Sequence, residues 1–318
     1  MPASVWLLRR LLGGVAVVLS ISLLVFLAIR LLPSDPARVI LGPGAPEASL
    51  QVLRDQLGLQ APLWQQYLGW LTALLHGNPG VSLDSQVSVA TLLAERLGNS
   101  LTLLLPFALI STLLALGLGA WLAVHRDGRI DRAALALLVL FKSLPGFVLA
   151  IGLILVFATG LLNWLPAVSL LQPERPLLSQ WQYLILPVAA LVLGGSPYLI
   201  RLMRASMIEA LHSEYVDAAR LRGIRHWRLV LGHALPNALV PLLQGLALTL
   251  SVFFSSSLLI EMAFAFPGLG SLLNDAIRLR DVPVIQAAVS LIALFVVLIN
   301  LAADVLTLLL SPRLRSAR

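Results

Sequence analysis

Ionisable side chains are scarce in this chain, and their densest regularly spaced group lies between residues 214 and 236. The segment reads EYVDAARLRGIRHWRLVLGHALP, and in it Asp217-Ala218-Ala219 is followed by Gly223 and then by Leu235-Pro236. Long apolar runs flank the segment on both sides. Because apolar runs cross a bilayer on hydropathy alone, a polar segment with defined spacing between two of them is predicted to bind a partner.

A second feature is Lys142, the only lysine of the chain, which stands in Phe141-Lys142-Ser143 within an apolar run. A phosphate-binding P-loop needs Gly-Lys-Ser or Gly-Lys-Thr, so Phe141-Lys142-Ser143 is not a P-loop. An ionisable group inside a membrane span costs about 2.5 to 3.5 kcal/mol on insertion scales and usually faces protein or water. Lys142 and Asp304 lie at similar depths, about 13 Å from the inner helix ends, which suggests an ion pair. Snorkelling of Lys142, with a separate polar contact for Asp304, is the alternative.

The residue types disfavour both an intramembrane serine protease and an ion-coupled transporter. Gly194-Gly195-Ser196-Pro197 offers a serine, but Pro197 spoils a protease motif and the histidines lie in or beside loops. Secondary transporters usually carry intramembrane acids, whereas Asp304 is the only acid clearly inside a span. A secondary transporter not coupled to an ATPase remains the alternative function.

Metal coordination by side chains is also disfavoured. The chain has no cysteine, which excludes disulfides and thiolate metal sites. The imidazole and thioether side chains lie at the edges of apolar runs or are scattered: His76, His125, His212, His226, His233, Met203, Met207 and Met262. Direct metal binding by this chain is therefore not expected, although a chelated metal could still pass through it.

The elements that must position these residues are membrane spans. Of the 318 residues, 59% are hydrophobic and 12% are charged, and the mean hydropathy is +0.93, whereas soluble domains carry about 25% charged residues. The composition predicts an all-α polytopic membrane protein with six transmembrane helices. The expected spans are Leu11–Leu32, Leu101–Val124, Ala133–Leu162, Tyr183–Met203, Ala238–Ile260 and Val284–Leu310. The first run is too long for the apolar core of a signal peptide, about 7 to 15 residues, and is predicted to be a retained span.

The distribution of basic residues predicts the orientation, because short loops rich in arginine stay cytoplasmic. One side collects Arg9, Arg10, Arg126, Arg129, Arg132, Arg201, Arg204, Arg220, Arg222, Arg225, Arg228, Arg313, Arg315 and Arg318. The opposite side holds the acids Asp35, Glu47, Asp55, Asp84, Glu95, Glu174 and Asp281. Both termini are therefore expected in the cytoplasm. The basic residues form no single stripe, so no nucleic-acid partner is expected.

Four regions follow from this topology. Residues 1–32 comprise a cytoplasmic tail and the first span, and residues 33–100 form a periplasmic segment with amphipathic helices expected at Leu50–Leu57 and Leu63–Leu75. Residues 101–310 form a five-span core with a cytoplasmic loop at 205–236, and residues 311–318 form a cytoplasmic tail. Amphipathic helices of this kind rest on a membrane surface.

The cytoplasmic loop is predicted to be a helix-turn-helix. A first helix is expected over Ala205–Arg222, Gly223 breaks it, and a second helix is expected over His226–Ala234, before Pro236. Ala218 and Ala219 remove bulk and permit close approach of a partner surface. The arginines of the loop are able to bind anionic lipid or acidic partner residues. A generic positive-inside loop is the alternative.

Short motifs follow one another in a fixed order along essentially the whole chain. They include Leu32-Pro33-Ser34-Asp35-Pro36, Leu57-Gly58-Leu59, Asp217-Ala218-Ala219 with Gly223 and Leu235-Pro236, Phe266-Pro267-Gly268-Leu269-Gly270, Arg280-Asp281-Val282-Pro283 and Pro312-Arg313-Leu314-Arg315. In order and spacing they resemble inner-membrane permease subunits of ABC importers in the dipeptide, oligopeptide and nickel branch. The loop resembles the EAA loop of that family, with Asp217 in place of the usual glutamate.

The resemblance implies a type I permease architecture and a division of labour. A periplasmic or lipoprotein solute-binding protein delivers short peptides or nickel and other metal chelates. A second homologous permease subunit completes the path, and two ABC ATPase subunits bind ATP and Mg²⁺. The chain lies in the bacterial inner membrane, with lipid around it.

The resemblance also assigns residues to these contacts. The loop transmits ATPase motion to the pore through Glu214, Tyr215, Asp217, Ala218, Ala219, Arg220, Gly223, Leu235 and Pro236. A short outer helix at Ser271–Leu279 is expected near the gate. The outer gate or binding-protein contact is assigned to Glu261, Pro267, Gly268, Gly270, Asp275, Arg278 and Asp281.

Overall fold

The computed structural model describes residues 3–31, 36–42, 44–56, 60–160, 162–172 and 177–310. The expected cytoplasmic tail at 311–318 with its three arginines, residues 32–35 of the Leu32-Pro33-Ser34-Asp35-Pro36 motif, the Leu57-Gly58-Leu59 motif and Glu174 lie outside the described residues. Within the described ranges the chain is helical and forms no extended strand; an isolated antiparallel bridge joins Val81 and Ser88. The expectation of an all-α fold is confirmed.

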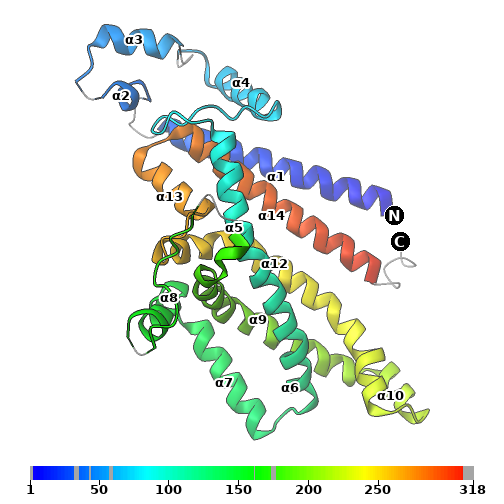
Figure 1. Ribbon diagram of the computed structural model, residues 1–318. Helices are drawn as coiled ribbons and strands as arrows, with labels where there is room; N and C mark the ends of the chain where they lie inside the picture. Colours follow the sequence, from blue (N-terminus) through cyan, green and yellow to red (C-terminus); the bar gives the residue numbers. More distant parts are fainter. Residues whose placement is uncertain are drawn as a thin grey trace. The chain divides into compact units, whose positions relative to one another are not determined.

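The helices follow one another along the chain as Figure 1 labels them. The α-helices are α1 (Ala3–Leu31), α2 (Pro36–Leu41), α3 (Glu47–Gln56), α4 (Leu63–Leu75), α5 (Val89–Leu114), α6 (Ala120–Val124), α7 (Arg129–Ser143), α8 (Gly146–Ile154), α9 (Ile185–Leu211), α10 (Glu214–Leu221), α11 (His226–Leu229), α12 (Leu235–Ala263), α13 (Leu269–Leu279) and α14 (Val282–Leu310). Wider π-helical turns lie at Ala115–Gly119 (η1), Leu155–Thr159 (η2) and Val230–Ala234 (η4), and a 3₁₀ helix lies at Leu177–Tyr183 (η3).

Five helices in the described ranges are long and apolar enough to cross a membrane, and a bent pair raises the number to six. The expected third span, Ala133–Leu162, is this pair: α7 and the helix at Gly146–Thr159 meet at an angle of 101°. The expected third span is therefore present as a pair of helices with a sharp bend between them. Proline lacks the N–H that would continue the helix, and it forces the preceding residue out of the helical region. Leu144, which precedes Pro145, is extended at φ −82° and ψ 131°.

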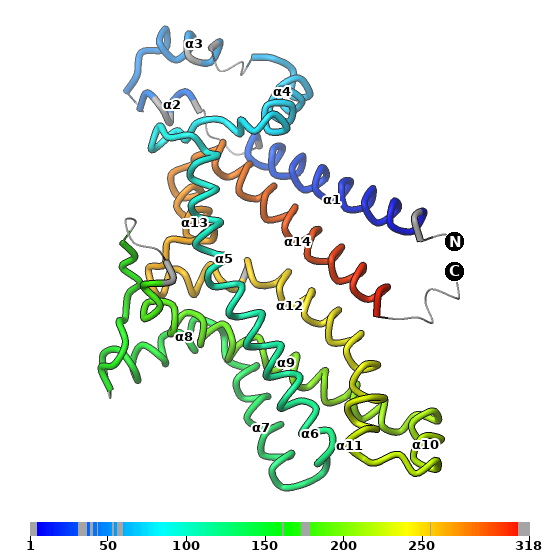
Figure 2. Tube along the Cα trace, turned by 45° about the vertical axis from the view of Figure 1, so that its right-hand side comes forward, coloured from blue at the N-terminus to red at the C-terminus, as the bar shows by residue number. Residues whose placement is uncertain are grey.

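The described chain divides into two compact units. The first comprises residues 1–8, 101–266 and 298–318, and the second comprises residues 9–100 and 267–297. In the first unit α9 is the central helix, packed by α12, α7, α8 and α6 (Figure 2). Leu199, Met203 and Met207 of α9 are fully buried. Apolar side chains around the helix are typical of a span enclosed by protein.

Helices of the first unit approach α9 closely at glycines. A methyl group added at Gly119 would lie 2.8 Å from the carbonyl oxygen of Ile200 and 2.9 Å from Cβ of Met203. Helix backbones come this near only where no side chain intervenes. The glycine thus sets the spacing between the second span and α9.

The second unit contains the short helices α2, α3 and α4. The expected helix at Leu63–Leu75 is α4, and the one expected at Leu50–Leu57 is α3, which begins earlier, at Glu47. Tyr67 of α4 packs on Phe26 of α1, with ring centroids 5.5 Å apart, and its hydroxyl lies 2.8 Å from Oγ of Ser22. In α3, Arg54 donates a hydrogen bond of 2.7 Å to Glu47, which lowers the pKa of that carboxyl.

Candidate functional site

The polar loop contains two short helices, α10 and α11. The first of them is much shorter than the expected helix Ala205–Arg222. The expected helix Ala205–Arg222 is wrong, because α9 ends at Leu211 and α10 begins at Glu214. Ser213 leaves the helical region at ψ 147°, and its carbonyl accepts the amides of Val216 and Asp217. Serine favours this position before a helix over its interior. The break lets α10 take its own direction.

Charges are placed to suit the dipole of α10. Glu214 and Asp217 lie in its first turn, and Arg220 lies in its last turn, where each sign is favoured. Arg220 donates to Asp217 at 3.1 Å, and both side chains are more than half exposed. Such an exposed pair contributes about 0 to 1 kcal/mol to the stability of the fold. Both side chains can therefore leave the pair and contact a partner with little loss of stability.

The two alanines of the motif face opposite ways. Ala219 is buried with Val216 and Leu229, while Ala218 is exposed. The expectation that both alanines face a partner is therefore wrong for Ala219, which packs inside the loop. Positions 216 and 219 are three apart in the sequence, so both fall on the inner face of the helix.

Tyr215 and Gly223 shape the loop from within. Tyr215 packs against the small core of the loop, and its hydroxyl donates to the carbonyl of His233 at 3.3 Å. Gly223 has φ +77°, and no heavy atom lies within 4 Å of the position that a Cβ would take. Backbone conformation, rather than space, therefore requires glycine here.

The loop exposes large apolar side chains that the motif did not predict. Leu221 is 90% exposed, Trp227 55% and Leu231 57%. The guanidinium of Arg228 lies 5.1 Å from the centre of the Trp227 ring. Large apolar residues exposed on a segment rich in charges mark an interaction surface. Their signal in the sequence was the interruption of a charged run by leucine and tryptophan.

Leu235 and Pro236 connect the loop to a span. The second loop helix was expected to end before Pro236, but the chain continues from α11 through the π-helical turn η4 into α12, and His226–Phe254 reads as one span. This expectation was wrong, because proline is accepted in the first turn of a helix, where Pro236 stands in α12. Leu235 packs on the core around α9. Motion of α11 can therefore pass directly into α12.

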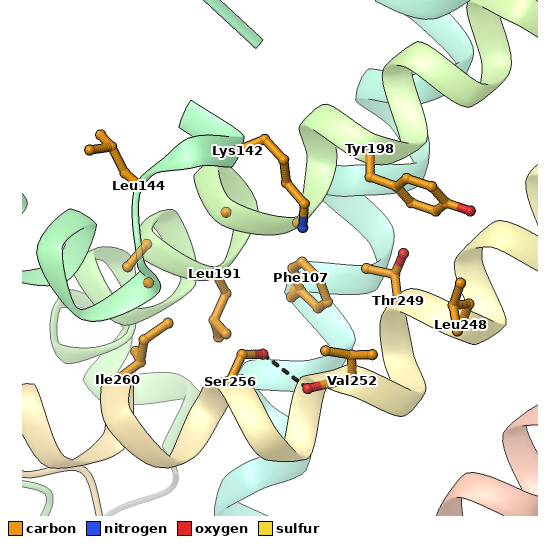
Figure 3. A pocket seen from close by; sticks show the side chains of 14 residues that line it. Phe107, Lys142, Leu144, Leu191, Tyr198, Leu248, Thr249, Val252, Ser256 and Ile260 are labelled. Carbon is orange, nitrogen blue, oxygen red and sulfur yellow. Dashed lines mark hydrogen bonds between the residues drawn. The ribbon is translucent and has the colours of Figure 1, made fainter. Parts of the chain in front are cut away.

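Lys142 and Asp304 do not form the expected ion pair. Asp304 accepts a hydrogen bond of 3.5 Å from the amide of Gln244, which also donates to Thr307 at 2.8 Å. Lys142 has no ion-pair partner among the described residues and lines a cavity between helices of the first unit (Figure 3). Similar depth along two predicted spans therefore did not place the two charges together.

The expected outer helix is present as α13, and it begins at Leu269 rather than Ser271. Asn99 of α5 donates to the carbonyl of Pro267 at 2.8 Å, and Ser100 accepts the amide of Leu269 at 2.8 Å. Pro267, Gly268 and Gly270 thus shape a turn that is fastened to α5. Gly268 and Gly270 are buried, so neither offers a surface.

The four charged residues assigned to the outer contact separate into two groups. Glu261 is 0% exposed and Asp281 is 3% exposed, so an outer contact by either carboxylate was a wrong expectation. Asp281 instead accepts hydrogen bonds from Oγ of Ser82 at 2.5 Å and from the amide of Leu83 at 3.1 Å. The carboxylate therefore ties the start of α14 to the turn before α5.

Asp275 and Arg278 of α13 are exposed and line a cavity of about 390 Å³ together with Arg96 of α5. The Nε atom of Arg96 is buried and has no hydrogen-bond partner among the described residues. A guanidinium in this state is suited to an incoming carboxylate. Arg96 was not identified from the sequence, in which it resembles any other arginine near the end of a span.

A buried ion pair also escaped the sequence analysis. Arg204 of α9 donates to Asp131 of α7 through Nε at 2.8 Å and through its terminal nitrogen at 2.6 Å. The amide of Asp127 donates to the same carboxylate at 2.9 Å. The side chain of Asp131 is 1% exposed and that of Arg204 17%. Arg204 is therefore a structural partner of α7 rather than a free charge of the polar loop.

The chain is similar to known proteins over nearly its whole length. Residues 115–316 match the family described as binding-protein-dependent transport system inner membrane component, and residues 4–103 match the N-terminal part of such membrane components. The glutathione transport system permease protein GsiC of Salmonella typhimurium (strain LT2) is 36% identical over 310 residues, which cover 98% of each protein. GsiC of Escherichia coli (strain K12) is 35% identical over the same length and coverage. The polar loop, Lys142 and α13 all lie within residues 115–316.

Proposed function

The chain belongs to the family of binding-protein-dependent transport system inner membrane components, and from this premise we propose how it moves its cargo. As a member of the dipeptide and oligopeptide branch, it is a non-catalytic, multi-pass inner-membrane permease of an ABC importer. An ATPase and a solute-binding protein are its partners. The cargo that we propose is a short peptide, with glutathione included because GsiC relatives are named for it; nickel or another metal chelate is the alternative.

The polar loop at Glu214–Pro236 receives the motion of one ATPase subunit. The observation that carries this proposal is the exposed apolar surface of Leu221, Trp227 and Leu231 on a charged loop. Ala218, Asp217 and Arg220 lie exposed on α10, where they extend that surface with small and charged groups. Continuity of α11 with α12 then delivers the displacement to the spans.

The remaining parts of the assembly follow from the same reasoning. A second, homologous permease subunit completes the path as a heterodimer. The loop lies in the cytoplasm together with both termini, because the arginine-rich segments share one side. The exposed pair Asp275 and Arg278, with Arg96 beside them, faces the solute-binding protein on the other side.

Replacement of Leu221 tests the loop contact. The complete importer, with both permease subunits, its ATPases and its binding protein, is reconstituted in nanodiscs, and ATP hydrolysis is measured with and without loaded binding protein. Leu221→Asp is expected to lower the stimulated rate about tenfold, because it places a charge in a contact surface that is otherwise apolar. Leu221→Met and Arg222→Gln serve as matched controls and should retain at least half of the rate. An unchanged rate for Leu221→Asp would contradict the assignment of the loop.

A further inference from the structure

A cavity of about 300 Å³ lies within the first unit, and five helical elements or their junctions enclose it. Phe107 comes from α5, Lys142 from the end of α7, Gly146 from α8, Gly194 and Gly195 from α9, and Thr249 and Ser256 from α12. Figure 3 shows the Lys142 side chain reaching down from α7 into the space beside Phe107 and Thr249. The cavity thus lies where the bent span meets the central helices.

Lys142 is the charged group of this cavity. None of the other described residues that line it is acidic or basic, and the structure gives Lys142 no ion pair or hydrogen bond within the described ranges. An ammonium in a membrane span faces water or protein instead of lipid. The break at Leu144-Pro145 ends α7 just after Lys142. Lys142 therefore lies in the last turn of α7, at the cavity.

The opposite wall is aromatic and rigid. Phe107 stacks on Phe253 with ring centroids 5.7 Å apart and an interplanar angle of 26°. A methyl group added at Gly195 would lie 2.7 Å from the Phe107 ring, so the glycine admits the ring against the backbone of α9. Leu191, Val252 and Ile260 complete an apolar surface.

The hydroxyl groups of the cavity are suited to secondary contacts. Thr249 donates to the carbonyl of Gly245 at 2.8 Å, and Ser256 donates to the carbonyl of Val252 at 3.1 Å. Because their protons are directed to the backbone, their oxygens can accept a donor from a ligand. Tyr198 also lines the space. One cation, hydroxyl oxygens and an apolar wall match a solute that carries a carboxylate, an N–H group and an apolar part.

We propose that Lys142 binds the carboxylate of the transported solute in this cavity, with Phe107 against its apolar part. The inference rests on the proposed function and deepens it, because it specifies an anionic group on the cargo. A bare divalent cation would be repelled by the ammonium, and the described lining residues include no carboxylate to hold it. A peptide with a free carboxylate, or a carboxylate chelate, satisfies the site.

Chemical protection of Lys142 tests the site directly. Since Lys142 is the only lysine of this chain, its acetylation by an amine-reactive ester can be followed by mass spectrometry in the complete wild-type importer. Glutathione, or a tripeptide with free carboxylate, is expected to slow acetylation at least threefold under turnover with ATP and binding protein. The same tripeptide as a carboxyl-terminal amide, used as the matched ligand, should give no protection. Equal labelling in all conditions would overturn the proposal.

Transport by substituted importers provides the second measurement. Lys142→Met is expected to lower uptake of the free tripeptide at least tenfold while stimulation of the ATPase by loaded binding protein persists, and Lys142→Arg is expected to retain most uptake. Uptake by Lys142→Met at the wild-type rate would refute the site. A parallel loss of ATPase stimulation in Lys142→Met but not in Lys142→Arg would assign Lys142 a structural role and refute it as well.

Two further outcomes distinguish the proposed carboxylate site from a lipid site and from an error in the proposed cargo. If the protection of Lys142 depends on phosphatidylglycerol in the nanodisc and not on the peptide, the site binds a lipid headgroup and the proposal is wrong. If the wild-type importer takes up none of the peptides, the proposed cargo class is wrong. Protection of Lys142 by the same peptides would then still support a carboxylate site, whereas uptake without protection overturns the inference alone.

Discussion

At the scale of the residue, Asp131 and Arg204 show how one buried carboxylate can organise a membrane-edge helix pair. Two hydrogen bonds from the guanidinium and one from the amide of Asp127 satisfy the carboxylate. Removal of one charge leaves the other buried without its counter-ion, which is more costly than the pair is favourable. The pair therefore fixes α7 against α9 more by the penalty of breaking it than by its attraction.

Asp131→Asn is expected to destabilise the permease by about 3 to 5 kcal/mol because it leaves Arg204 without a counter-ion. The measurement is the thermal unfolding midpoint of the purified complex. Asp127→Asn is the control, since the Asp127 side chain is 82% exposed in a 3.9 Å pair with Arg126, and it should change stability by less than about 1 kcal/mol. Recovery in the double variant Asp131→Asn with Arg204→Met would confirm the mechanism, and equal effects of both single variants would contradict it.

Gly223 gives a second prediction for a single residue. Gly223→Ala is expected to cost about 1 to 2 kcal/mol locally, because alanine is strained at φ +77°. ATPase stimulation by loaded binding protein should fall accordingly. Gly232→Ala is the matched control in the same loop: it likewise has nothing within 4 Å of an added Cβ, and its φ is not positive. The prediction fails if both variants lose stimulation equally, because backbone handedness would then not be the cause.

At the scale of the element, close packing around α9 depends on glycines at definite faces of neighbouring helices. Gly117 and Gly119 lie two residues apart in the same π-helical turn, but only Gly119 is held against the backbone of Ile200. Helix interfaces in membranes rely on such small residues, since lipid chains supply no hydrophobic drive between helices.

Gly119→Ala is therefore expected to destabilise the first unit by about 1 to 3 kcal/mol through overpacking, whereas Gly117→Ala should be close to neutral. The thermal unfolding midpoint of the complex in detergent distinguishes them. A lowered midpoint for Gly117→Ala, or an unchanged midpoint for Gly119→Ala, would contradict the close contact between Gly119 and α9.

At the scale of the whole molecule, the basic residues predict the orientation in the membrane. Arginine-rich segments remain on the cytoplasmic side, and we propose that the polar loop lies on that side, where an ATPase can bind it. The same proposal places α13 and its exposed Asp275 on the side of the solute-binding protein.

Cysteine labelling tests this orientation without interference, because the chain has no cysteine of its own. Arg222→Cys should react with a membrane-impermeant maleimide only after the membrane is opened. Asp275→Cys should react in intact spheroplasts; its side chain is exposed on α13. The reverse pattern would invert the topology and place the loop away from any ATPase.

Local properties of the sequence were sufficient for the all-α class of fold and for most of the long apolar helices. Hydropathy, proline, glycine and charge act within one turn or one span, so their effects can be read along the chain. The helix at Leu63–Leu75 was predicted for this reason, whereas the outer helix was expected from the resemblance to the family. The family was also predicted from the sequence, because the order of short motifs is itself a property of the sequence.

Tertiary structure decided which residues meet. Asp131 and Arg204 are 73 positions apart, Asp281 reaches Ser82 across 199 positions, and Asp304 accepts a hydrogen bond from Gln244 rather than from Lys142. Whether Ala219 or Ala218 is exposed depended on how α10 packs against α11. A charge becomes a partner, a structural tie or a ligand site according to the groups that folding brings around it, and those groups come from distant parts of the chain.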